Sequence, residues 1–151
     1  MTLTLTSSAF RDGQAISETY AQAGNNKSPP LAWRGAPDGT KSFVLVVEDH
    51  DAPVGTVTHW IVYDVPADSD GLLEGLDNDQ VAQGRNDMGH SRYDGPKPPK
   101  GHGPHRYHFR LSALGIASLG LSDKPEPNAV KKAARGHVLA EAELVGTFET
   151  V

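Results

Sequence analysis

A histidine and a tyrosine stand at the start of an apolar, strand-like stretch of this chain, directly after a loop rich in proline and glycine. Alternate residues of a strand point to opposite faces, so His105 and Tyr107 share a face with Phe109 and Leu111. Imidazole and phenol groups can donate hydrogen bonds to a ligand. The pattern therefore predicts a small polar pocket at one end of the core, beneath the stiff loop 93–104.

Two more polar groups accompany apolar strand faces. Counting by twos places Asp49 on the same face as Phe43, Leu45 and Val47, and it places His59 on the face of the apolar residues 61, 63 and 65. A buried carboxylate needs a partner, and the histidines are the obvious candidates. The four groups either converge at one end of the core or are each satisfied separately. Face patterns do not say which strands are neighbours, so both interpretations stay open.

The elements that would position these groups are mostly strands. The expected strands are Thr2–Thr6, Ile16–Tyr20, Ser42–Asp49, Thr58–Val65 and His105–Leu114, with an irregular connection over Ala67–Ser91. Ser42–Asp49 is apolar on both faces, which is typical of a central strand buried on both sides. A helix is expected from Asn128 to Glu143. Long connections between strands and a terminal helix favour a β-sandwich over residues 1–151 as one domain.

Composition excludes several classes of function. The chain has 151 residues, a formal net charge of -5 and a pI near 5.7, which argue against a general nucleic-acid or membrane-surface binder. It contains no cysteine, so neither a disulfide framework nor a thiolate metal site is expected. We find neither a signal peptide nor a long apolar stretch, and we expect a soluble, cytoplasmic protein from a bacterium or archaeon without stable membrane insertion.

Three segments resemble the phosphatidylethanolamine-binding protein family, in particular its prokaryotic, Raf-kinase-inhibitor-like branch. They are Asn26-Lys27-Ser28-Pro29-Pro30-Leu31-Ala32-Trp33, then Asp49-His50-Asp51-Ala52-Pro53 followed by His59-Trp60, and finally Gly95-Pro96-Lys97-Pro98-Pro99 through Gly103-Pro104-His105-Arg106-Tyr107. The terminal segment 136–148 is also similar to that branch. Order and spacing agree across nearly the whole chain.

The resemblance implies a mainly β fold, an antiparallel Greek-key β-sandwich with a C-terminal helix and short peripheral helices. It also implies a small anion pocket for phosphate or phosphorylated head groups. We expect neither a cofactor nor a metal. By position, the ligand-binding residues are Asp49, Asp51, Ala52, Pro53, His59, Pro98, His105 and Tyr107. The chain departs from the family pattern at His50, where the motif has proline, and at Phe148, where many relatives have tyrosine. We also expect a cis bond before Pro53, Pro98 or Pro99.

Asp49 is the awkward member of such a pocket, because a carboxylate repels an anion. It must either orient a histidine by accepting that ring's N–H or be protonated itself. Anion binding should therefore be weak and should strengthen as pH falls through the histidine range.

Two classes of function follow. The favoured class is a non-enzymatic module that binds small anions or phosphorylated head groups and whose occupancy alters the surface seen by a protein partner, as a kinase-inhibitor-like regulator would. The alternative is a hydrolase acting on small phosphate or carboxylate esters through Asp49, Asp51 and His59. The spacing of His102, His105 and His108 would suit metal ligands on a helix. The glycines and proline in this segment exclude that helix, so we do not expect a metal site there. The sequence does not identify the protein partner, and a homodimer is one of the oligomeric states it allows.

Overall fold

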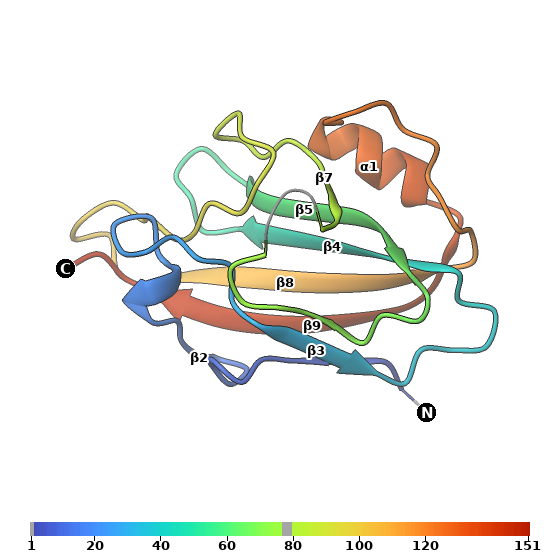
Figure 1. Ribbon diagram of the computed structural model, residues 1–151. Coiled ribbons are helices and arrows are strands. Elements are labelled where there is room, and N and C mark those ends of the chain that lie inside the picture. The colour runs from blue at the N-terminus through green and yellow to red at the C-terminus, as the bar shows by residue number, and fades with distance from the viewer. Residues whose placement is uncertain (1, 77–79) are drawn as a thin grey trace.

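The computed structural model describes residues 2–76 and 80–151, which form a mainly β structure with two sheets and one α-helix (Figure 1). The smaller sheet has the order β1 (Thr4–Thr6), β3 (Leu31–Arg34), β6 (Gly71–Leu72). The larger has the order β2 (Gln14–Ala15), β9 (Val138–Phe148), β8 (His105–Leu114), β4 (Ser42–Asp49), β5 (Val57–Pro66), β7 (Ala82–Gln83). The helix α1 spans Pro127–Ala134, and a 3-10 turn spans Glu18–Tyr20. Within these described ranges no helix is long and apolar enough to cross a membrane.

Strand β4 lies in the middle of the larger sheet, as its apolar sequence predicts, and it separates two apolar clusters. Phe43, Leu45 and Val47 pack into the cluster shared by the two sheets. Val44 faces the other way, into a second cluster that includes Val130 of α1. Both faces of β4 are covered, which is why nearly every residue of the strand is buried.

The expected helix over Asn128–Glu143 is wrong in its second half. The helix ends at Ala134, and Gly136 follows with φ +88°, a left-handed conformation that terminates helices and suits glycine. The chain then runs as β9, antiparallel to β8. The C-terminal element is therefore a strand, held by pairing with β8 rather than by helix propensity.

The face assigned to His59 by counting along its strand is also wrong. Ile61 and Tyr63 pack on the helix side of the sheet. His59, in contrast, lies against Tyr107 on the side of the shared core. The register of β5 against β4 passes from Trp60 directly to Thr58, which leaves His59 as the extra residue of a β-bulge. A bulge shifts the alternation by one residue, so simple parity fails at this point.

The short elements were the least well predicted. Ile16–Tyr20 is not a strand, since the strand β2 precedes it and a 3-10 turn occupies its end. Strand β3 was missed, and Ala67–Ser91 contains the two-residue strands β6 and β7. One strand pair, β2 with β9, is parallel. The Greek-key connectivity and the further peripheral helices stay predictions.

The expected cis proline is not found, because residues 2–76 and 80–151 contain no cis peptide bond. At Pro53 the local geometry gives a reason. The Gly55 N–H donates to the Ala52 carbonyl at 3.0 Å, closing a turn in which Pro53 takes the second position. Trans proline suits that position, whereas cis proline belongs at the third position of a turn.

Antiparallel pairing brings three strand ends to one edge of the larger sheet. Strand β4 ends there at Asp49, while β5 and β8 begin there with His59 and His105 close to their first residues. In Figure 1 the C terminus and the yellow loop before β8 lie at this same end. The Gly101 N–H donates to the Thr150 carbonyl and joins the two.

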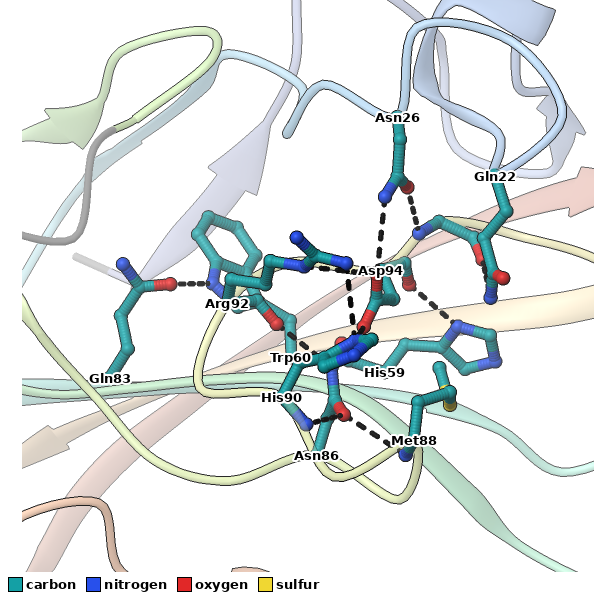
Figure 2. A network of polar contacts seen from close by, with 11 residues as sticks. Gln22, Asn26, His59, Trp60, Gln83, Asn86, Met88, His90, Arg92 and Asp94 are labelled. Carbon is teal, nitrogen blue, oxygen red and sulfur yellow. Dashed lines mark hydrogen bonds and ion pairs between the residues drawn. The ribbon is translucent and has the colours of Figure 1, made fainter.

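The buried Asp94 is the centre of a network of polar contacts beside His59 (Figure 2). The carboxylate of Asp94 accepts from the side-chain amides of Asn86 at 2.8 Å and Asn26 at 3.1 Å, and it contacts His90 Nδ1 at 2.7 Å. Arg92 adds an ion pair at 3.4 Å. Burial by itself would raise the pKa of Asp94, but the hydrogen bonds from these neighbours outweigh it and lower the pKa below its ordinary value.

Gly95, the next residue, passes so close to the chain at Tyr20 that only glycine fits. A Cβ atom at this position would lie 1.8 Å from the Tyr20 carbonyl oxygen and 3.0 Å from the Ala21 Cα, both backbone atoms. We expect Gly95→Ala to reduce the free energy of unfolding by about 2–3 kcal/mol, since a backbone clash cannot be relieved by a rotamer change. The matched control is Gly115→Ala, whose Cβ would meet only the Leu139 side chain at 3.6 Å or more. Equal urea midpoints for the two variants would contradict this close approach.

The Asp94 network should make stability depend on pH. A carboxyl group whose pKa is lowered on folding stabilises the fold above its unfolded pKa near 4 and loses that effect as pH falls through its folded pKa. Asp94→Asn should therefore cost about 1–3 kcal/mol at pH 7, with the difference from the parent protein shrinking at low pH. Asp38→Asn, at an exposed site, is the control. Urea denaturation across pH measures both, and a difference for Asp94→Asn that does not change with pH would contradict the expectation.

Candidate functional site

A buried aspartate–histidine pair forms the centre of the candidate site. The carboxylate of Asp49 contacts His105 Nδ1 at 2.7 Å, and the two residues are 3% and 2% exposed. The other carboxylate oxygen accepts the backbone N–H of Asp51 at 2.8 Å. Both oxygens of Asp49 are thus occupied by protein donors. This geometry fits the first of the two arrangements expected for Asp49, in which it orients a histidine by accepting its N–H.

His59 and Tyr107 lie beside this pair on the core side of the sheet. Their rings meet edge to face with centroids 5.2 Å apart. His59 Nδ1–H donates to the Asp94 carbonyl at 2.7 Å, and burial lowers the pKa of the His59 ring despite that hydrogen bond. Burial, followed by the charge of Asp49 and a hydrogen bond to it, raises the pKa of Tyr107. Both groups are therefore neutral at pH 7, so His59 is poorly suited to supply positive charge to an anion.

The open space at this edge lies outside His105. A hollow of about 390 Å³ is lined by Asp51, His102, Pro104, His105, Arg106 and Thr147. By contrast, the space bordered by His59, Tyr107 and the loop at Asp94 is too narrow to admit a water molecule. The space beside His59 is therefore closed, and the accessible hollow borders His105 and His102 instead.

Asp51 is held by the arginine at the start of β8. Its carboxylate accepts from the Arg106 backbone N–H at 2.8 Å and from the guanidinium at 3.0 and 3.2 Å. These hydrogen bonds lower the pKa of Asp51 to about 2. Asp51 thus fixes the loop after β4 to β8, and it balances the positive charge of Arg106 beside the hollow.

The remaining expected site residues lie farther from the hollow. Ala52 and Pro53 lie in the turn that follows Asp51 and are half-buried and exposed. Pro98 is buried but lines neither the outer hollow nor the closed space. Their part in ligand binding stays a prediction.

The two departures from the family motif can also be placed. His50 turns to the outer face of the sheet and stacks on His108, with ring centroids 4.4 Å apart. It therefore leaves the hollow unchanged. Phe148 pairs with His105 across β8 and β9 and packs against the shared core.

Sequence reasoning missed three residues that shape the site. His102 lines the hollow and contacts His105, Arg106 fixes Asp51, and Asp94 holds His59. His102 was considered only as a metal ligand, and Arg106 was named only within the third family motif. Their contacts run between a loop and a strand end, which strand periodicity does not reveal. Among the residues that the structure describes, no group of three or more acidic, histidine or cysteine side chains is arranged to hold a metal ion.

Comparison with known proteins supports the resemblance. The family model described as phosphatidylethanolamine-binding protein matches residues 6–149. A protein of Aquifex aeolicus named only as a UPF0098 protein is 42% identical over 147 residues, which cover 95% of this chain and 86% of the relative.

Two crystal structures are similar over their full length. The phosphatidylethanolamine-binding protein homologue CT736 of Chlamydia trachomatis is 37% identical, with a TM-score of 0.92 and 99% of both chains covered. YbcL of Escherichia coli, described as a member of the mammalian family, is 30% identical, with a TM-score of 0.93 and all of both chains covered. On motif order, family match and shared fold, this chain belongs to the phosphatidylethanolamine-binding protein family.

Proposed function

We propose that this protein is a cytoplasmic, non-enzymatic module that binds a small anion or a phosphorylated head group, and that occupancy of the site alters the surface offered to a protein partner. The observation that carries the proposal is the oriented His105 ring at the floor of the outer hollow. Its Nδ1 is fixed by buried Asp49, so its Nε2 faces the hollow side, where His102 contacts it.

The charges around the hollow suit a weakly held, singly charged ligand. Arg106 is paired with Asp51, and the carboxyl group of Asp49 lies close behind His105. A dianion would gain little unless the histidines were protonated, while a head group with its own ammonium could meet the acidic groups. Two adjacent imidazoles make affinity depend on pH.

A hydrolase is the second candidate, and the Asp49–His105 pair is the observation in its favour. A carboxylate that orients an imidazole is the arrangement of a general base. Purified protein should nevertheless show no turnover of p-nitrophenyl phosphate or p-nitrophenyl acetate above that of His105→Ala. A rate that falls more than tenfold in this variant would favour the hydrolase and count against the binding module.

We expect inorganic phosphate and phosphoethanolamine to shift the NMR ring signals of His105 and His59, and to leave exposed His137 unchanged. Affinity should rise as pH falls through the histidine range, because an imidazolium attracts an anion more strongly than a neutral ring. His105→Ala should weaken binding by about 1–3 kcal/mol, the usual range for a charged hydrogen bond.

The matched control is His108→Ala, on the opposite face of the same strand. It removes an imidazole from β8 without touching the hollow. Because His105→Ala leaves Asp49 without its partner, His105→Asn and a circular dichroism spectrum of each variant separate lost binding from lost folding. If the His108 and His105 variants lose affinity equally, the ligand does not bind on the His105 side of the sheet and the proposed site is wrong.

A further inference from the structure

Three side chains form a continuous line from the core to the surface at this edge. Asp49 contacts His105 Nδ1 at 2.7 Å, and His105 Nε2 contacts His102 Nδ1 at 2.8 Å. The first two residues are buried, whereas His102 is exposed and lines the outer hollow. The line therefore ends at the surface in one imidazole nitrogen, His102 Nε2.

The backbone on both sides of His102 holds this ring in place. Gly101 and Gly103 have φ values of +77° and +81°, which other residues adopt only at a cost. A Cβ atom at either position would meet nothing within 4 Å, so the glycines serve the backbone conformation rather than close packing. The His102 N–H also donates to the Pro99 carbonyl. The loop is thus built to turn His102 back onto His105.

Hydrogen-bond rules fix where the protons lie in this line. An ionised carboxylate only accepts, so His105 Nδ1 carries a proton. In the uncharged pair, His105 Nε2 is then bare and accepts from His102 Nδ1–H, which leaves His102 Nε2 bare. Adding one proton to either ring changes this, because His102 Nε2 then carries hydrogen in both arrangements. One proton therefore converts the outer nitrogen from an acceptor into a donor.

The groups facing this pair favour a single added proton. Asp49 and Asp51 are the nearby anions, and Asp51 is already paired with Arg106. Tyr107 and His59 lie on the core side, and both are neutral at pH 7. Strand β9 contributes the uncharged Thr147. A second proton would place hydrogen on both nitrogens of the 2.8 Å contact and break it.

We propose that His102 is a further anion-binding residue, and that one proton taken up by the His102–His105 pair turns its outer nitrogen into the donor that holds the anion. The proposal rests on the anion-binding function above and adds to it the residue at the surface and the proton that controls it. The same anion should bind poorly to the uncharged pair, whose outer nitrogen presents a lone pair.

The first test needs no ligand. At a pH above the range in which histidines titrate, long-range ¹H–¹⁵N spectra of the ligand-free protein should show the Nδ1–H tautomer for both His102 and His105. An Nε2–H tautomer for His102 would overturn the proposal, whatever the protein binds.

The second test measures the proton itself, with sulfate as the probe, since sulfate stays fully ionised between pH 5 and 8. Its association constant should fall about tenfold per pH unit above the pair's titration, the slope for one linked proton. In His102→Gln the amide donates at every pH, so binding should lose most of this slope. His137→Gln, at an exposed histidine elsewhere, should keep it.

The outcomes distinguish a failure of the His102 inference from a failure of the proposed anion binding. If His102→Gln binds sulfate with the full slope, the controlling proton lies elsewhere and the inference fails, while anion binding stands. If the parent protein binds neither sulfate nor phosphoethanolamine at any pH, the proposed function fails as well.

Discussion

Burying Asp49 at the end of a central strand is the constraint on which the site depends. A carboxylate at 3% exposure is costly unless its oxygens are hydrogen-bonded, and the protein meets that requirement with His105 and the backbone of Asp51. These partners come from β8 and from the loop after β4. The carboxylate therefore ties together the strand end, the loop that follows it and the first residue of the neighbouring strand.

A second buried carboxylate, that of Asp94, ties together the chain segments around His59. Asp94 is held by Asn26 from one segment and by Asn86 and His90 from the loop just before it, and its carbonyl fixes the ring of His59. The Pro/Gly loop approaches the 3-10 turn closely at Gly95, while His102, farther along the loop, lines the outer hollow. Asp49 contacts His105 and Asp94 contacts His59, and the two histidines have different environments. His59 is neutral and enclosed, and His105 is oriented toward the surface.

Much of the fold could be predicted from local sequence. Ser42–Asp49 and His105–Leu114 have the predicted bounds, since their hydrophobic patterns are strong and their alternation is uninterrupted. Strand β9 was mistaken for helix because alanine, glutamate and leucine favour helices. The alternation of Ala140, Glu141, Ala142 and Glu143 has the two-residue period of a strand and was the better signal. The bulge at His59 could not be predicted, because it is a property of pairing with β4.

The same division applies to the site. Motif order pointed to the residues that the structure brings together, Asp49, His59, His105 and Tyr107. It did not show that the accessible hollow lies outside His105, nor that Asp51 is bound by Arg106. Those facts depend on side-chain contacts between separate elements. Two-residue strands and a loop-borne histidine carry too little local pattern to be recognised.

A crystal structure grown in phosphate tests the central claim most directly. We predict one phosphate ion in the outer hollow, within hydrogen-bond distance of His102 or His105, with the Asp49–His105 contact intact. Phosphate bound only at another surface, such as the hollow lined by Tyr63, Arg85 and Lys124, with the outer hollow empty, would contradict it.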